Sequence, residues 1–247
     1  MSKSSQFVVI NTKSIYCRYD REEIETFSAD MLSAKFWQDS NSITGSAQGR
    51  GTTWFVKQID ETNNNEKHWV LRHYFRGGLI GKIITDSYFF TSQENTRAAK
   101  EFALLAHMQT LQLPAPKPIA YRVSRHGLFY RADLLSSRIE NAQDLVAILT
   151  KKSIDEATWY AIGETIKTFH NHGIYHHDLN AHNILLDDKN KHWLIDFDQG
   201  EIKTPQKGWQ QNNLQRLLRS FHKEQSQLPI FNWNVDNWNT LLNGYNS

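Results

Sequence analysis

Residues 175–187 read YHHDLNAHNILLD, a polar loop between two apolar runs. Asp178 stands in this loop, Asn183 follows it, and Asp196 lies in the later segment LIDFDQG. A carboxylate such as that of Asp178 can accept the proton of a hydroxyl group that attacks a phosphorus atom. Carboxylate and amide oxygens, here those of Asp196 and Asn183, can hold Mg²⁺ beside a polyphosphate. The pattern therefore predicts phosphoryl transfer to a hydroxyl group.

The same residues allow two other interpretations. The loop could be a polar turn with incidental histidines. Alternatively, His176 and Asp178 could bind iron together with a second histidine, as in the two-histidine, one-carboxylate sites of non-haem oxygenases. The candidates for that second histidine are His182, His192 and His222. The second acidic motif follows the loop after a strand, a turn and a strand, and this order favours phosphoryl transfer.

The charge and the cysteine content limit the possible partners and compartments. The chain has 28 basic and 26 acidic residues, too balanced to bind nucleic acid by neutralising many phosphates. Any anion site must therefore be local. Cys17 is the sole cysteine, which excludes an intrachain disulfide and a thiolate metal cluster and fits a reducing compartment. Neither a signal peptide nor an apolar segment of about 20 residues is visible, so we expect a cytoplasmic protein.

The first part of the chain predicts strands around one helix. TTWFVKQI and HWVLRHY read as two strands of a hairpin whose turn is TNNNEK, residues 62–67. Residues 121–135 read as a second hairpin that turns at Gly127. Between the hairpins, Thr91 and Glu94 form a T-x-x-E capping box ahead of a helix that begins near residue 97.

Glu101 stands on the apolar stripe of this helix. Helical spacing puts it on the same face as three apolar residues, Ala98, Leu105 and Met108. A buried carboxylate needs a cationic partner. The sequence therefore predicts an ion pair at Glu101.

The second part of the chain predicts mainly helices. The prolines of LPAPKPIA, residues 113–120, end the preceding helix. A capping box from Ser153 to Glu156 opens a helix that stops at Gly173, and short strands follow. We therefore predict an α+β fold with a strand-rich lobe over residues 1–134 and a mainly helical lobe over residues 135–247.

The loop and the later acidic motif resemble those of the protein-kinase fold. HHDLNAHN matches the catalytic loop H-R-D-L-x-x-x-N, with His176, Asp178 and Asn183 in register and His177 in place of the arginine. The triplet DFD, which begins at Asp196, stands in place of D-F-G. The resemblance implies a two-lobe kinase-like fold that forms a single domain, with Asp178 as the catalytic base and with Asn183 and Asp196 as ligands of Mg²⁺.

The first part of the chain extends this resemblance. SAQGRGTTWFV is similar to a glycine-rich loop over phosphates, with Gly49 and Gly51 as the first two glycines. WVLR is similar to V-A-I-K and puts Arg72 where the lysine that binds phosphate would stand, which makes Glu101 its partner. Because guanidinium differs in shape from ammonium, Lys82 remains an alternative for this cation.

Further segments resemble the lipopolysaccharide kinases of Gram-negative bacteria, and among them the kinases of 3-deoxy-D-manno-octulosonic acid (Kdo). No A-P-E triplet follows DFD, and little room is left for an activation loop. The segments that carry this resemblance are VLRHYFRGGLIGKI, LPAPKP, YHHDLNAHNILLD, WLIDFDQG and NLQRLLRSF.

This resemblance implies transfer of the γ-phosphate of ATP, with Mg²⁺, to the 4-hydroxyl of Kdo on a lipid A precursor. It further implies peripheral contact with the cytoplasmic face of the inner membrane. No obligate protein partner is expected. Arg76 and Lys82 are candidate contacts for an anionic group of the substrate. A kinase for another core sugar such as heptose, a kinase for protein, and an inactive nucleotide-binding module remain alternatives.

Residues 213–223, NLQRLLRSFHK, carry an apolar stripe and three basic residues on other faces. A helix on a membrane surface has this pattern, and so does a helix that packs its apolar stripe into a core. The nearby tryptophans Trp209, Trp233 and Trp238 could likewise lie at a lipid interface or fill the core.

Overall fold

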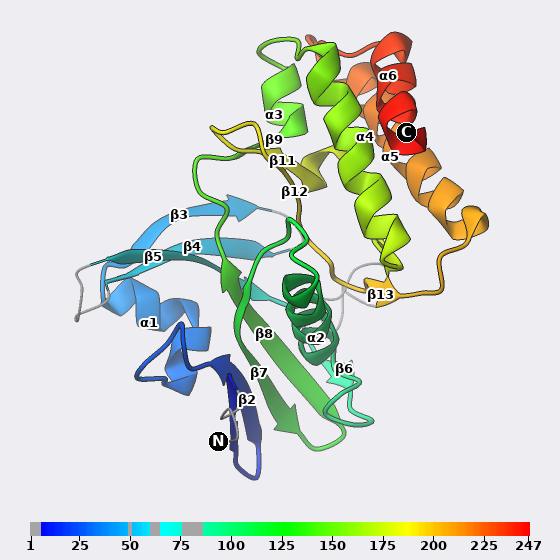
Figure 1. The fold of residues 1–247 in the computed structure, drawn as a ribbon. Helices are drawn as coiled ribbons and strands as arrows, with labels where there is room; N and C mark the ends of the chain where they lie inside the picture. Colours follow the sequence, from blue (N-terminus) through cyan, green and yellow to red (C-terminus); the bar gives the residue numbers. More distant parts are fainter. Residues whose placement is uncertain (1–5, 49–50, 60–64, 76–85) are drawn as a thin grey trace, which may run out of the picture. The chain divides into compact units, whose positions relative to one another are not determined.

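The computed structural model describes residues 6–48, 51–59, 65–75 and 86–247. The chain divides into two compact units, which are Met1–Ala106 with Pro116–Arg138 and His107–Ala115 with Ile139–Ser247. The first is rich in strands and the second is mainly helical, so the predicted α+β class is confirmed (Figure 1). The sequence placed the end of the strand-rich lobe at residue 134, and the last strand of that unit continues to Ser137.

The first unit is built on one antiparallel sheet. Its strands lie side by side in the order β1 (Phe7–Asn11), β2 (Ile15–Asp20), β7 (Pro118–His126), β8 (Phe129–Ser137), β5 (Glu66–His73), β4 (Thr52–Ile59) and β3 (Ile43–Gln48), and β6 (Tyr88–Phe89) also pairs with β8. Both predicted strand pairs, β4 with β5 and β7 with β8, are confirmed. Gly127 has a φ of 60° in the tight turn from β7 to β8, where glycine carries no steric cost.

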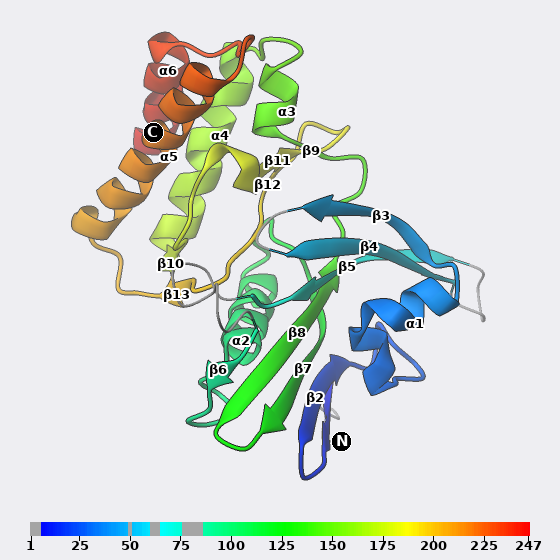
Figure 2. The same ribbon diagram turned by 180° about the vertical axis from the view of Figure 1, so that it is seen from behind.

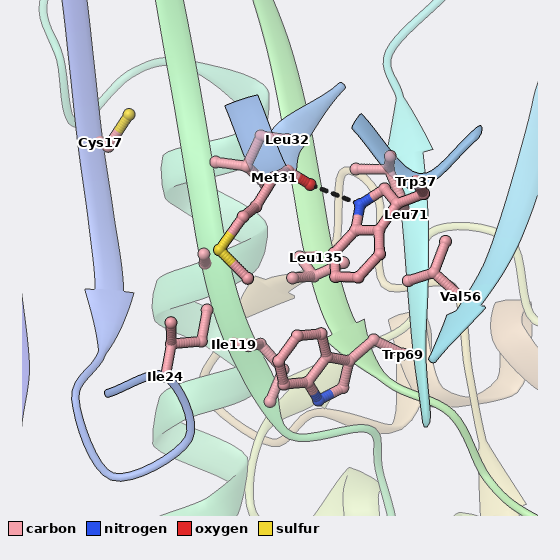
Figure 3. Close-up of a cluster of buried hydrophobic side chains, with 11 residues drawn as sticks. Cys17, Ile24, Met31, Leu32, Trp37, Val56, Trp69, Leu71, Ile119 and Leu135 are labelled. Atoms are coloured by element: carbon pink, nitrogen blue, oxygen red, sulfur yellow. Dashed lines mark hydrogen bonds between the residues drawn. The ribbon is translucent and has the colours of Figure 1, made fainter. Parts of the chain in front are cut away.

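A hydrophobic cluster fills the space between this sheet and the short helices η1 (Ala29–Leu32) and α1 (Ala34–Asp39) (Figure 3). Trp37 and Trp69 meet edge to face with their ring centroids 6.0 Å apart. The indole N–H of Trp37 donates to the carbonyl of Met31 at 2.7 Å, so its burial leaves no unpaired donor. Cys17 is fully buried, and burial raises the pKa of its thiol to about 11, which makes it unreactive.

Helix α2 (Arg97–Thr110) packs its buried face on the sheet of the first unit. The ring of Phe102 lies 5.1 Å from that of Phe7 and 5.1 Å from that of Tyr121. The predicted capping box at Thr91 does not open this helix. The helix begins at Arg97, because the first helical hydrogen bond runs from the Lys100 N–H to the carbonyl of Thr96, at 3.0 Å.

The second unit combines four α-helices with short strands in the described residues. The helices are α3 (Leu145–Leu149), α4 (Glu156–Asn171), α5 (Lys207–Gln227) and α6 (Val235–Asn246). The strands are β9 (Gln143–Asp144), β11 (Ile184–Leu186) and β12 (His192–Leu194) in one sheet, and β10 (Ile174–Tyr175) with β13 (Glu201–Ile202) in another. Figure 2 shows α4, α5 and α6 side by side.

The ends of α4 are set by short-range contacts. The side chain of Asp155 caps the helix by accepting from the Thr158 N–H at 2.8 Å, so the predicted cap at Ser153 is wrong. A carboxylate is a strong acceptor for the unpaired N–H groups of a first helical turn. At the other end, Gly173 adopts a φ of 73°, and the helix stops where the sequence predicted.

The apolar stripe of α5 is buried in the core of the second unit. Phe221 stacks on Trp233 with ring centroids 5.3 Å apart and meets Trp159 at 5.6 Å. Leu214 and Leu217 are buried beside it. The core-packing interpretation of this helix is therefore confirmed. Its apolar face is not available to a lipid surface.

Helices α4 and α6 are in direct backbone contact at two glycines. A Cβ atom added at Gly163 would lie 2.0 Å from the carbonyl oxygen of Leu241, and one at Gly244 would lie 2.0 Å from that of Tyr160. These distances are far shorter than any van der Waals contact. Only glycine permits this approach of the two helices.

Gly163→Ala is expected to lower the free energy of unfolding by about 1–3 kcal/mol, because the added methyl group forces α4 and α6 apart. Urea unfolding followed by circular dichroism measures this change. Gly208→Ala is the matched control, because Gly208 is also helical but has no atom within 4 Å of the added carbon. It should stabilise by up to about 1 kcal/mol, the helix propensity gained by alanine. Equal stability of the Gly163 variant and the wild type would contradict the backbone contact.

Candidate active site

Hydrogen bonds hold the loop after β10 in one conformation. The side-chain N–H₂ of Asn183 donates to the carbonyl of Asp178 at 2.9 Å, and that of Asn180 donates to the same carbonyl at 3.1 Å. The side-chain oxygen of Asn180 in turn caps the 3-10 helix η3 (Ala181–Asn183) by accepting from the N–H groups of His182 and Asn183. The spacing of the two asparagines after Asp178 therefore shapes the loop that carries the carboxylate.

Asn183 and Asp196 are brought together by the pairing of β11 with β12. The carbonyl of Asn183 accepts from the N–H of Ile195 at 3.0 Å, and Asp196 is the next residue. Because the amide nitrogen of Asn183 donates to Asp178, its side-chain oxygen is the atom that can bind a cation. An amide oxygen and a carboxylate are suitable donors for Mg²⁺, so the donor set fits this ion.

Asp196 has an unusual backbone. Its φ is 60°, in the left-handed region that only glycine, asparagine and aspartate adopt readily. The next residue, Phe197, is fully buried and stacks on Phe169 with ring centroids 5.8 Å apart. The buried ring therefore fixes the segment while the side chain of Asp196 stays exposed. Strained backbone of this kind is frequent at functional sites.

The iron-site interpretation is wrong because His176, which it requires as a ligand, is engaged elsewhere. Nε2 of His176 bonds the carbonyl of Ile195 at 2.9 Å, and Nδ1 accepts from the N–H of Asp178 at 3.2 Å. His176 therefore has no ring nitrogen left for a metal. In the described part of the chain, no three histidine, cysteine or carboxylate side chains are arranged to hold a metal ion.

A buried polar network anchors the loop to α5. The side-chain oxygen of Asn213 accepts from the backbone N–H of His176 at 3.3 Å, and its N–H₂ donates to the carbonyl of His176 at 3.0 Å. The same oxygen lies 3.4 Å from Nε2 of His170, whose Nδ1 lies 2.8 Å from the hydroxyl of Tyr245. Asn213 thus ties both backbone polar groups of His176 to α5 and, through His170 and Tyr245, to α4 and α6.

These partners define the protonation of both histidines. The oxygen of Asn213 can only accept, so Nε2 of His170 carries the proton, and its Nδ1 accepts from Tyr245. Nδ1 of His176 accepts, so its Nε2 carries the proton. Both rings are neutral. Burial lowers the pKa of both, that of His170 to about 4.

Acid is therefore expected to destabilise the second unit. The unfolded state returns His170 to its usual pKa of 6.5 and binds a proton that the folded state excludes down to about pH 4. The free energy of unfolding should fall as the pH drops from about 6.5 to about 4, with at most about 3 kcal/mol from this residue. The contribution of His170 to the free energy of unfolding should be fully retained above pH 6.5.

Urea unfolding at a pH above and a pH within this window measures the effect. His170→Gln should reduce the difference in stability between the two conditions. His172→Gln is the control, because His172 is exposed on the same segment and should leave the difference unchanged. An undiminished pH dependence in the His170 variant would contradict the neutral, buried imidazole.

The carboxylate of Asp178 has a cationic partner that the sequence did not indicate. Nη1 of Arg216, on α5, lies 2.7 Å from Oδ1 of Asp178. Both side chains are close to half exposed, so the pair adds little to stability. The ion pair instead positions the side chain of Asp178, because it directs one oxygen of the carboxylate toward α5.

The first unit contains the predicted ion pair. Arg72 on β5 bonds Glu101, which is only 4% exposed, and the hydroxyl of Tyr74 donates to the same carboxylate at 2.6 Å. Burial raises the pKa of Tyr74 well above its usual value, so this hydroxyl remains a donor. The pairing is confirmed. A role of the two residues in binding nucleotide stays a prediction.

The remaining predicted residues of the first unit are only partly described. A Cβ atom at Gly51 would lie 2.0 Å from the ring of Phe75, so a larger residue there requires the ring to move. Gly49, Arg76 and Lys82 lie outside the described residues. Their assignment to a phosphate loop and to substrate contacts stays a prediction.

Comparison with known proteins shows the family to which this chain belongs. A sequence model of the lipopolysaccharide kinase (Kdo/WaaP) family matches residues 34–245. The protein belongs to this family. The predicted protein-kinase-like fold, with a strand-rich part followed by a mainly helical part, agrees with this membership. The matched residues include both the loop with Asp178 and the buried pair of Arg72 and Glu101.

Several similar proteins carry the name 3-deoxy-D-manno-octulosonic acid kinase. The one from Vibrio parahaemolyticus serotype O3:K6 (strain RIMD 2210633) is 50% identical over 83% of this chain and 84% of the relative. The one from Photobacterium damsela subsp. piscicida is 44% identical over 94% of each chain. Among solved structures, the kinase PK-1 of Cydia pomonella granulovirus aligns with 71% of this chain and 58% of its own chain, with 14% identity and a TM-score of 0.44.

Two residues that contact the loop could not be predicted from spacing alone. Asn213 and Arg216 lie 37 and 38 residues after the loop residues that they contact, His176 and Asp178. The polar face of α5 was the available signal, since it places both residues beside the apolar stripe.

No helix in the described residues is long and apolar enough to cross a bilayer.

Proposed function

We propose that this protein transfers the γ-phosphate of ATP to the 4-hydroxyl of Kdo on a lipid A precursor, a step in building the inner core of lipopolysaccharide. The observation that carries this proposal is an identity of 44–50% with proteins named 3-deoxy-D-manno-octulosonic acid kinase, over most of both chains. The organisation of the loop after β10 supports it, since Asn183 donates to the carbonyl of Asp178 and accepts from the N–H of Ile195, the residue before Asp196.

In the proposed reaction, Asp178 orients the acceptor hydroxyl and takes its proton. A bond forms between the hydroxyl oxygen and the γ-phosphorus while the bond from that phosphorus to the bridging oxygen breaks, and ADP leaves. The hydrogen bonds of Asn180 and Asn183 to the carbonyl of Asp178 hold the base in place before the substrate arrives. Positioning and charge stabilisation supply the rate enhancement.

Asn183 and Asp196 would hold Mg²⁺, which neutralises the phosphate oxygens when it is bound. Residues 1–134 would form the nucleotide lobe, and residues 135–247 the lobe that carries the base and the metal ligands. In the nucleotide lobe, Arg72 would contact the phosphates, with Glu101 and Tyr74 setting the position of its guanidinium group.

The acceptor in this proposal is part of a lipid. The protein would therefore work as a peripheral protein at the cytoplasmic side of the inner membrane of a Gram-negative bacterium. Because the apolar stripe of α5 is buried, contact with the membrane would rest on other surfaces and on the lipid substrate itself.

Labelling with radioactive phosphate tests the proposal. The purified protein is incubated with Mg²⁺, γ-labelled ATP and a Kdo-bearing lipid A precursor, beside the same lipid without Kdo. Label is expected only on the lipid with Kdo. Label on a heptose acceptor or on protein would identify a different kinase. Binding of ATP without transfer to any acceptor would identify an inactive nucleotide-binding module.

A further inference from the structure

Beside Asp178 lies a cavity of about 370 Å³ that belongs entirely to the second unit. Its volume is within the range of about 300–1,000 Å³ that is typical of small-molecule sites. The lining residues come from the catalytic loop and from α5, and they are Asp178, Asn180, His182, Arg216, Arg219, Ser220, Lys223 and Glu224. The hydroxyl of Ser220 accepts from the backbone N–H of Ala181 at 3.0 Å, which fastens the loop to this side of α5.

The wall formed by α5 is a stripe of basic side chains. Arg216, Arg219 and Lys223 are three, four and seven residues apart, so helical spacing places them on one face. This face is separate from the apolar stripe of the same helix, which is buried in the core. The three basic residues are therefore not part of the buried core of the second unit.

The charges in this cavity are not fully compensated. Arg216 pairs with Asp178 at 2.7 Å, and Lys223 lies 3.5 Å from the carboxylate of Glu224. His182 also contacts Glu224, at 3.5 Å. Arg219 makes no ion pair or hydrogen bond with any residue in the described ranges, and its side chain is exposed. The cavity therefore presents one guanidinium group without an anion, next to the proposed base.

We propose that this cavity binds the carboxylate of the acceptor sugar, with Arg219 as its principal contact and with Arg216 and Lys223 beside it. This inference rests on the proposed function. The acceptor hydroxyl must lie at Asp178 when it attacks, so an anion that reaches Arg219 must be close to that hydroxyl. An acidic sugar such as Kdo carries its carboxylate on the same ring as the hydroxyl, whereas the phosphates of the lipid belong to other sugars. Guanidinium groups bind carboxylates with strong, directional hydrogen bonds.

The test compares two acceptors with the full-length protein in neutral detergent micelles. One is the Kdo-bearing lipid A precursor, and the other is the same lipid with the Kdo carboxylate converted to its methyl ester. Arg219→Gln should raise KM for the acidic acceptor on the order of 10-fold, the effect of losing one charge-assisted hydrogen bond. The values of kcat and of KM for ATP should stay within about two-fold, because Arg219 is proposed to contact the acceptor and not the nucleotide. With the ester, the variant and the wild type should have the same KM.

Two variants serve as controls. Lys207→Gln removes an exposed positive charge from the same helix about 18 Å from Arg219, given a rise of about 1.5 Å per residue, and should behave as wild type. Arg219→Lys keeps the charge and should recover most of the affinity for the acidic acceptor. Circular dichroism should give the same unfolding curve for all these variants, because both positions are exposed.

The outcomes separate this inference from the proposed function. If the wild type labels neither lipid, the proposed function and the inference both fail. If the wild type labels the Kdo lipid but Arg219→Gln changes KM equally for acid and ester, the positive charge acts on a lipid phosphate or on the micelle surface, and the carboxylate assignment is overturned. A rise in KM for ATP, or an unchanged KM for the acidic acceptor, also overturns it.

Discussion

Asp178→Asn is expected to lower turnover on the order of 100-fold to 10,000-fold, the range for loss of a positioned general base. The amide keeps the shape of the side chain but cannot take the proton of the attacking hydroxyl. Because Asp178 is not among the proposed contacts of the nucleotide, the affinity for ATP should be nearly unchanged. Single-turnover transfer of labelled phosphate measures the first quantity, and titration calorimetry with ATP measures the second.

Two further variants show that this loss comes from the base itself. Asp188→Asn removes an exposed carboxylate from the turn between β11 and β12 and should leave turnover unchanged. Arg216→Gln removes the partner of Asp178 but keeps its carboxylate, so its loss should be smaller than that of Asp178→Asn. Turnover retained in the Asp178 variant would remove this residue from the role of base.

Asp196→Asn is expected to abolish the dependence of ATP binding on Mg²⁺. Asparagine tolerates the φ of 60° at this position, so the substitution removes the charge without a new strain in the backbone. The affinity for the Mg²⁺–ATP complex should fall by at least about 100-fold, since even residues that only support a metal ligand change metal affinity by about 10–100-fold. Calorimetric titrations of ATP with Mg²⁺ and with a chelator give this comparison directly.

Asp198→Asn is the informative companion variant. Asp198 stands two residues further on, beyond the buried ring of Phe197. An effect confined to Asp196→Asn assigns the metal to Asp196, and an equal effect in both variants makes Asp198 a second ligand. If Mg²⁺ still strengthens ATP binding in the Asp196 variant, the metal assignment is wrong.

The sequence predicted those parts of the site that depend on short spacing or on the chemistry of one residue. Asp178 and Asn183 lie on one loop, so their proximity follows from the chain itself. The need of Glu101 for a cation was predicted because a carboxylate on a buried stripe requires one. The choice of Arg72, 29 residues away, came from the resemblance of WVLR to the V-A-I-K motif. The order of strands and helices followed from the periodicity of apolar residues.

The contacts of α5 could not be predicted in the same way. Its apolar periodicity identifies the buried face but says nothing about which element faces the polar one. The proximity of Arg216 to Asp178 depends on how α5 packs in the second unit, which is a tertiary property. The helix starts near residue 97 and at Glu156 were predicted correctly, but the capping residues were not. Asp155 competes with Ser153 as a cap within one turn, and only the three-dimensional fold shows which residue is used.

The network around Asn213 determines how the catalytic loop can open locally. Surface loops usually open locally, at a small fraction of the energy needed to unfold the protein. Here both backbone groups of His176 are bound by a buried side chain of α5, which also contacts His170 on α4. The loop is thereby joined to α4, which is in close backbone contact with α6 at Gly163. Amide hydrogen exchange at His176 would accordingly require the cooperative opening of those helices, so the geometry around the proposed base would be lost only together with them.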